Sequence, residues 1–266
     1  MTKISILGCG WLGFPLAEAL ISEGFEVNGS TTSESKLAFL QNSGIQPFLI
    51  SVSESGIEGN ISGFLNSDIL IVDIPPKLRG LEKENFVSKM QNLIDCIENA
   101  AIQKVLFISS TSVYADDNSI ITEEKKPNPD NESGRQLYAS EQLFQKNKSF
   151  KTTILRFGGL IGDDRHPVKF LAGKENLENP NGPINLIHLK DCIGIILKII
   201  KTQKWNDVFN AVAPFHPTRK DFYSLQAQIL NLPEPKFSND KISVGKTIDV
   251  SKIISVLDYQ FVFEKL

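Results

Sequence analysis

The feature that most constrains this chain is a glycine turn between a short apolar run and an amphipathic helical pattern. Residues 3–7 are mainly apolar and suit a strand that is buried on both faces. The next six residues, Gly8-Cys9-Gly10-Trp11-Leu12-Gly13, contain the spacing G-x-G-x-x-G. A stripe with helical spacing follows, formed by Gly13, Leu16, Ala17 and Leu20. The sequence therefore predicts a strand, a tight turn and a helix.

Each of the three glycines in this turn suits one requirement of dinucleotide binding. Gly8 permits the tight turn, Gly10 leaves bare backbone for a pyrophosphate, and Gly13 lets the helix pack closely on the strand. The helix N-terminus also presents free N–H groups and a partial positive charge to phosphates. We therefore predict a dinucleotide site here that includes Trp11 and Leu12. The alternative is an ordinary strand-to-helix turn.

Composition and charge exclude several classes of partner. Of the 266 residues, 41% are hydrophobic, which is enough for a sizeable core. Lys and Arg total 28 against 31 Asp and Glu, so we expect no nucleic-acid partner. The longest apolar helical stretch, residues 192–200, is too short to span a membrane. A strand that begins at residue 3 leaves no room for a signal peptide, so we expect a cytoplasmic protein.

Cysteines and histidines give no sign of a metal site. The three cysteines and three histidines are scattered along the chain, without the spacing of metal ligands. We therefore expect reduced thiols and no bound metal.

Strand and helix patterns alternate through most of the chain. After the first strand, strands are expected at residues 26–30, 47–52, 68–73, 104–109 and 152–157. This alternation predicts an α/β fold, a doubly wound parallel Rossmann sheet with helices on both faces. We expect the dinucleotide-binding core to span 1–163, joined by about 184–213. Residues 164–183 and 214–266 are then expected to form a small C-terminal cap, built from separated segments, at the substrate.

The end of the second strand bears on which dinucleotide binds. NAD-binding folds usually carry an acid there, but this chain has hydroxyls and a lysine: Ser30, Thr31, Thr32 and Lys36. The missing acid favours NADP, with NAD as the alternative cofactor. A solvated loop that caps the next helix is an equally good interpretation. At later strand ends, the candidate cofactor residues are Ile74, Pro75, Ser109 and Phe157.

Segments spread along the chain resemble the extended short-chain dehydrogenases/reductases. Ser109-Ser110, followed by Val113-Tyr114, is similar to the family's S-S-x-x-V-Y-G segment. Residues 155–162, 185–191 and 257–261 resemble its L-R-x-x-x-x-Y-G, I-H-V-x-D and L-G-Y-x-F segments. The likeness is greatest to an atypical bacterial subgroup labelled YeeZ-like. It implies an NAD(P)-dependent oxidoreductase or epimerase, a small substrate of nucleotide-sugar type and a homodimer.

The family's catalytic Tyr-x-x-x-Lys pair is missing in both registers that this sequence allows. One register uses Tyr138 but places Gln142 where the lysine belongs. The other register aligns this chain with the family's N-P dipeptide, glycine and glutamate. In that alignment Ser133 stands at the position of the tyrosine and Leu137 at the position of the lysine. We prefer the second register. Without a neighbouring cation, a tyrosine with a pKa near 10 is a poor acid or base near neutrality.

Three residues remain as candidates for catalysis: Ser110, Ser133 and Arg135. Ser110 matches the family's catalytic hydroxyl, although a cap at the strand end is an equally good interpretation. In the second half, Arg156, Arg165, His166, Lys169 and Lys174 could bind an anionic substrate or be solvated loop charges. Two hypotheses follow. The chain is an NADP-dependent oxidoreductase or epimerase-like enzyme, or a non-catalytic NADP(H)-binding sensor or regulatory protein.

Overall fold

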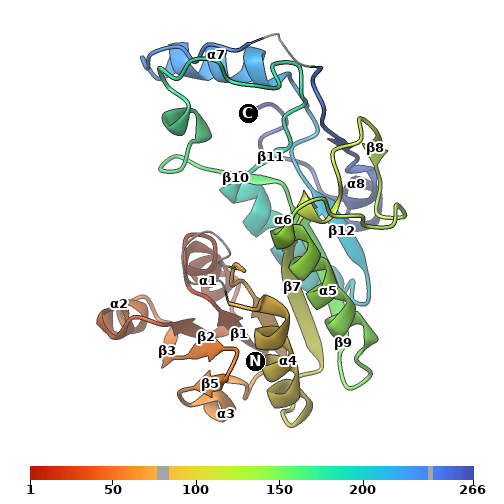
Figure 1. Cartoon of the computed structure of the whole chain (residues 1–266). Helices are drawn as coiled ribbons and strands as arrows, with labels where there is room; N and C mark the ends of the chain where they lie inside the picture. The colour runs from red at the N-terminus through yellow and green to blue at the C-terminus, as the bar shows by residue number, and fades with distance from the viewer. Residues whose placement is uncertain (77–83, 239–241) are drawn as a thin grey trace.

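The centre of the fold is a seven-stranded parallel sheet (Figure 1). The structure, a computed structural model, describes residues 1–76, 84–238 and 242–266. In spatial order the strands are β3 (Gln46–Leu49), β2 (Glu26–Thr31), β1 (Lys3–Leu7), β6 (Ile69–Val72), β7 (Lys104–Ser110), β9 (Lys151–Phe157) and β12 (Val208–Ala211). The strand order places the first strand at the point where the order of the strands reverses, as in dinucleotide-binding folds. The predicted doubly wound parallel sheet is therefore confirmed.

Helices cover the sheet on both faces. α4 (Phe86–Glu98) packs against α5 (Glu132–Lys146), and both lie in front of the sheet in Figure 1. α1 (Gly13–Ser22) contacts α6 (Leu189–Thr202), which also contacts α8 (Ser251–Leu257). The shorter or more peripheral helices are α2 (Leu37–Asn42), α3 (Ile61–Phe64) and α7 (Arg219–Ile229).

The apolar stripes of α1 and α4 are buried as their spacing predicts. The buried residues of α1 are Gly13, Leu16, Ala17 and Leu20. In α4, the buried face includes Phe86, Met90, Leu93 and Ile97. Burial of a large apolar side chain contributes about 1.5–3 kcal/mol, so these stripes fix both helices against the sheet.

The third strand is shorter than the sequence predicts. A single strand is expected over 47–52, but β3 ends at Leu49, and β4 (Ser51–Ser53) pairs antiparallel with β5 (Gly56–Glu58). Ile50 separates the two strands; its side chain is buried and its N–H donates to the Thr31 carbonyl. Gly56 has a positive φ of 139°, which permits the tight hairpin after β4. The hairpin lies beside α4.

A second, smaller apolar cluster lies beyond the carboxyl edge of the sheet. It joins α7 to the segment around β10 (Gly159–Ile161) and β11 (Leu186–His188), which pair with each other. Residues 248–261 pack instead on the main core. β8 (Ile120–Ile121) and β13 (Thr247–Ile248) also pair. Within the described residues, no helix is long and apolar enough to cross a membrane. The proposed boundaries of the cap stay a prediction.

Candidate functional site

The carboxyl ends of β1, β2 and β6 surround a cavity of about 300 Å³. Eight candidate cofactor residues line it: Gly8, Gly10, Ser30, Thr31, Thr32, Lys36, Ile74 and Pro75. The other lining residues that matter below are Cys9, Asp73, Glu84 and Lys89. The remaining candidates, Trp11, Leu12, Gly13, Ser109 and Phe157, are not among the residues that line this cavity. Of these, Leu12, Gly13, Ser109 and Phe157 are buried.

The three glycines of the turn have different steric surroundings. Gly8 has φ +108°, and a Cβ on it would lie 2.4 Å from the main-chain oxygen of Asp73. A Cβ on Gly13 would lie 2.1 Å from the main-chain oxygen of Gly8. By contrast, a Cβ on Gly10 would meet nothing within 4 Å. The fold itself therefore requires Gly8 and Gly13, whereas Gly10 leaves the open space that a pyrophosphate would need.

The end of β2 supports the glycine turn as well as lining the cavity. The Ser30 hydroxyl oxygen accepts a hydrogen bond from the Gly8 N–H at 2.9 Å. The Thr31 hydroxyl oxygen accepts one from the Ser33 N–H at 3.1 Å. Thr32 and Lys36 are exposed at the rim, and Lys89 from α4, which also lines the cavity, pairs with Glu84. Among the described residues, Lys36 and Lys89 thus line the cavity, and only Lys36 was predicted from the sequence.

Asp73, directly after β6, is a cavity residue that the sequence analysis did not single out. Burial raises the pKa of its carboxyl to about 8, an effect opposed by the Gly13 N–H. Burial, followed by the charge of Asp73, raises the pKa of the Cys9 thiol to about 12. The position of Asp73 was nevertheless visible in the sequence, because Asp73 is the last residue of the expected fourth strand, immediately before Ile74 and Pro75.

Trp11 connects the glycine turn to the loop after β10. Its indole N–H donates to Asp164 at 2.9 Å, and the Arg165 guanidinium lies 5.0 Å from its ring centre. A Cβ on Gly162 would lie 2.9 Å from the same indole. Arg165, a candidate anion ligand, therefore stacks on Trp11, which brings the loop over the turn.

The other candidate anion ligands are not gathered in one place. The His166 ring accepts a hydrogen bond from the Val168 N–H and stacks on Phe222 in the small apolar cluster. Lys169 and Lys174 are exposed. Among the described residues, no three His, Cys, Asp or Glu side chains are grouped so that they could hold a metal ion.

The end of β7 carries the candidate catalytic hydroxyl. The Ser110 hydroxyl oxygen accepts a hydrogen bond from the Ser112 N–H at 3.1 Å, which caps the short helix Thr111–Val113. α5 begins nearby, because a Cβ on Gly134 would lie 2.2 Å from the Ser112 carbonyl oxygen. This close approach brings the first turn of α5, which holds Ser133 and Arg135, next to the loop after β7. The Arg135 side chain points to the surface, where it pairs with Glu132 at 2.9 Å.

The two registers of the missing pair occupy different environments on α5. In the preferred register, Ser133 is partly buried in the first helical turn, and Leu137 is buried with 5% of its surface exposed. In the other register, Tyr138 packs partly buried against the main core. A lysine at position 137 would consequently have to extend out of the core to reach solvent or a tyrosine.

At this edge the buried polar side chains form a hydrogen-bonded network. The Arg156 guanidinium donates to both carboxylate oxygens of Glu141, at 2.5–3.2 Å. The Ser109 hydroxyl donates to Glu141 at 2.5 Å, and Arg156 also donates to the Tyr114 hydroxyl. Tyr114 donates in turn to Asn210 at 3.2 Å. The network therefore occupies both Ser109, a candidate cofactor residue, and Arg156, a candidate substrate ligand.

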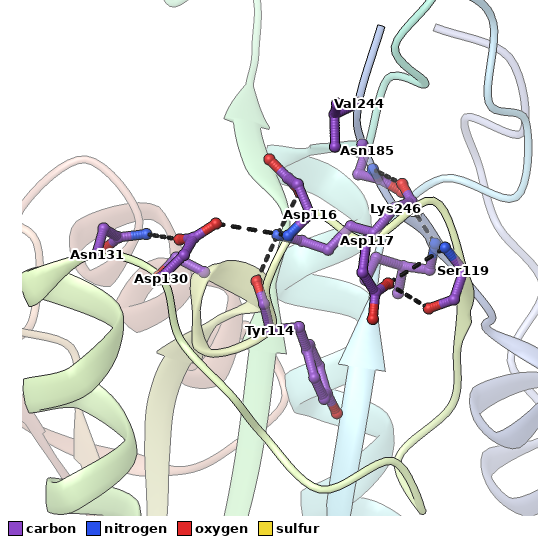
Figure 2. Close-up of polar contacts among 12 residues, drawn as sticks. Tyr114, Asp116, Asp117, Ser119, Asp130, Asn131, Asn185, Val244 and Lys246 are labelled. Atoms are coloured by element: carbon purple, nitrogen blue, oxygen red, sulfur yellow. Dashed lines mark hydrogen bonds and ion pairs between the residues drawn. The ribbon is translucent and has the colours of Figure 1, made fainter. Parts of the chain in front are cut away.

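A lysine from the C-terminal region fastens that region to the loop after β7 (Figure 2). Lys246 donates to the Tyr114 carbonyl at 2.7 Å and to the Asp116 carboxylate at 2.9 Å. The main-chain carbonyl of Lys246 accepts a hydrogen bond from the side-chain amide nitrogen of Asn185 at 2.7 Å. The oxygen of that side-chain amide accepts one from the Ile248 N–H. These contacts hold three separate chain segments together beside the carboxyl edge of the sheet.

Comparison with known proteins agrees with this architecture. The profile of the NAD dependent epimerase/dehydratase family matches residues 82–174. The protein YeeZ of Escherichia coli K12 is 34% identical over 264 residues, which are 98% of this chain and 96% of YeeZ.

Solved structures show the same fold at lower identity. UDP-glucuronic acid 4-epimerase from Bacillus cereus, in complex with NAD, superposes with a TM-score of 0.81 at 20% identity, covering 98% of this chain and 92% of the epimerase. UDP-N-acetylglucosamine 4-epimerase from Bacillus cereus gives 0.77 at 18% identity, covering 99% and 95%. The relationship with YeeZ extends over nearly the whole of both chains. The chain therefore belongs to the YeeZ-like branch of the NAD-dependent epimerase/dehydratase family, the extended short-chain dehydrogenases/reductases.

Proposed function

We propose that the chain binds NADP(H) in the cavity at the glycine turn, as an oxidoreductase or epimerase-like protein with a small, nucleotide-sugar-like substrate. The observation that carries the proposal is the turn itself. Gly8 and Gly13 are required by packing, while the space over Gly10 is open toward the cavity. The first turn of α1 adds the positive end of a helix at the same place. A bound nicotinamide dinucleotide would supply hydride transfer.

The preference for NADP(H) is supported by the residues that follow β2. Thr32 and Lys36 lie where an NAD-binding fold usually carries an acid. A lysine can pair with a phosphate as a point charge. Isothermal titration calorimetry with NADP+, NADPH, NAD+ and NADH tests the preference. We expect NADPH to bind more tightly than NADH, and Lys36→Ala to weaken NADPH more than NADH.

Each of the other outcomes of this titration has a definite meaning. Equal or tighter binding of NADH would refute the NADP preference but leave the site in place. If none of the four dinucleotides bound, the site itself would be refuted.

The second candidate function is a non-catalytic NADP(H)-binding sensor or regulatory protein. It is supported by the preferred register on α5, which places a serine and a buried leucine at the family's catalytic positions. General acid–base assistance is worth about two to four orders of magnitude in rate. Without it, the chain should turn over nucleotide sugars slowly or not at all.

A turnover assay separates the two functions. The protein would be incubated with NADP+ or NAD+ and with UDP-sugars, and the products followed by chromatography. Turnover at rates typical of enzymes, about 1 s⁻¹ or more, would support the enzyme. Tight cofactor binding without any product would support the sensor. The resemblance to the family also suggests a homodimer, which light scattering of the purified protein would test.

A further inference from the structure

Asp73 is held beside the junction where the first strand passes into the glycine turn. Its main-chain N–H donates to the Leu7 carbonyl at 2.9 Å. Its main-chain oxygen lies directly beneath Gly8, where it leaves no room for a Cβ. The residue also lines the cavity together with Gly8, Cys9 and Gly10. An acidic side chain is therefore built into the wall where the proposed function places a dinucleotide's phosphates.

The described groups around this carboxyl are a main-chain N–H and two thiols, which carry no positive charge. The Gly13 N–H, at the start of α1, is its hydrogen-bonding neighbour, and the Cys9 and Cys192 thiols lie close enough to interact with its charge. Burial holds the pKa of both thiols far above neutrality, at about 12 for Cys9. Within the described ranges, no lysine or arginine forms an ion pair with Asp73.

The remaining charged groups near the cavity and near α6 have other partners or lie at the rim. Lys89 pairs with Glu84, and Lys36 is exposed at the rim. On α6, Asp191 accepts hydrogen bonds from Tyr259 and from the main chain of Val262 and Phe263. Burial raises the pKa of Asp73 to about 8, so its carboxyl is mostly neutral at pH 7.

A neutral carboxyl and an ionised one have opposite effects on a phosphate. The neutral form carries an O–H that can donate a short, charge-assisted hydrogen bond to a phosphate oxygen. The ionised form has no donor, repels the phosphate, and competes with it for the N–H groups of the first turn of α1. We propose that Asp73 belongs to the dinucleotide site, where its protonated carboxyl donates a hydrogen bond to the pyrophosphate and its ionisation weakens binding.

This role rests on the proposed function and adds a pH dependence to it. The complex should retain the Asp73 proton to higher pH than the free protein does. Binding above pH 8 should then take up a proton, and the Kd for the cofactor should rise by up to about tenfold per pH unit. Below pH 7 the same residue should have little effect on the Kd.

Calorimetry with NADPH between pH 6.5 and 9.5 tests the role. For the wild-type protein we expect binding to weaken at least tenfold over this range, with the loss concentrated above pH 8. Asp73→Asn keeps a hydrogen-bond donor but cannot ionise, so it should bind within about threefold of wild type at pH 7 and lose most of the pH dependence. The matched control is Asp95→Asn on the exposed side of α4. This variant should keep the pH dependence of NADPH binding seen in the wild-type protein.

A second measurement uses only the wild-type protein. Titrations at pH 8.5 in buffers of different ionisation enthalpy report the protons taken up on binding. Uptake of a substantial fraction of one proton would support the role of Asp73, and no uptake would overturn it. An unchanged pH dependence in Asp73→Asn would overturn it as well. Failure of the wild-type protein to bind any dinucleotide at any pH would instead refute the proposed function, and this role with it.

Discussion

The two ends of the sheet's carboxyl edge differ in how they use polar groups. Around β1, β2 and β6, the edge is an open cavity whose glycine turn presents mainly backbone. Around β7 and β9, polar side chains bond to one another: Ser109 and Arg156 are both held by Glu141. A site formed by backbone tolerates side-chain replacement, whereas a catalytic pair depends on the identity of two side chains. This difference explains how a chain can keep the proposed cofactor cavity while serine and leucine occupy its proposed catalytic positions.

The largest effect is expected from a pair of glycine substitutions at the cavity end. Gly13→Val places a Cβ 2.1 Å from a main-chain oxygen and should prevent folding or lower the melting temperature by about 10 °C or more. Gly10→Val meets open space, so it should leave the melting temperature nearly unchanged while it abolishes NADPH binding. Thermal melts and calorimetry of both variants measure the two effects. Tight NADPH binding by Gly10→Val would contradict the placement of the pyrophosphate.

At the other end of the edge, the Arg156–Glu141 pair should be important for stability. The side chains of both residues are almost completely buried, so Arg156→Ala leaves an unpaired carboxylate in the core. Removal of one partner of a buried ion pair costs about 3–5 kcal/mol. We expect a loss of this size in the free energy of unfolding, measured in urea.

The double variant Arg156→Met/Glu141→Leu is the control for this prediction. It removes both charges, and we expect it to be more stable than Arg156→Ala alone. A loss below about 1 kcal/mol in Arg156→Ala would show that the network does not stabilise the fold. Arg156 would then again be a candidate for binding an anionic substrate.

Local patterns in the sequence predicted the cavity end well. The strand, glycine turn and helix at residues 3–22 depend on neighbouring residues, because the turn and the stripe of α1 have short, fixed spacings. The β4–β5 hairpin was missed, since strands of three residues are too short to show a periodicity. Asp73 was missed because its environment is formed by Cys9, Gly13 and Cys192, which are far from it in the chain.

The polar network at the other end could not be predicted from local patterns. Ser109 and Glu141 are 32 residues apart, and Glu141 and Arg156 are 15 apart. Their partners depend on how β7, α5 and β9 pack together, and no short motif encodes this. The roles suggested for Ser109 and Arg156 came from strand-end position and charge alone. In the structure, both side chains donate hydrogen bonds to Glu141 instead.

The pH dependence of stability should also differ between the two ends. The pKa of Asp73 is about 8 in the folded protein and near 3.8 in the unfolded chain, so between these values the folded state holds more protons. The contribution of Asp73 to stability therefore falls as pH rises from about 4 to 8, by at most about 1.4 kcal/mol per pH unit. Asp73→Asn should be more stable than wild type at pH 9, and this advantage should shrink toward pH 5.

Melting temperatures of the two proteins at pH 5, 7 and 9 measure this difference. Because other groups contribute to the pH profile of each protein, the relevant quantity is the variant minus the wild type. A constant difference across the range would contradict a raised pKa for the carboxyl of Asp73.

The smallest effect concerns Ser110, whose hydroxyl is either a cap or a catalytic group. Its oxygen accepts a hydrogen bond from the Ser112 N–H at 3.1 Å, so Ser110→Ala should cost about 1 kcal/mol in the free energy of unfolding. Ser110→Asn can still accept that hydrogen bond and should recover most of the loss, but it lacks a hydroxyl. If Ser110 only caps the loop, any turnover of nucleotide sugars should be the same in the asparagine variant as in wild type. A fall of tenfold or more in kcat, with stability restored, would show that the hydroxyl takes part in the chemistry and that the β7 end is still a catalytic site.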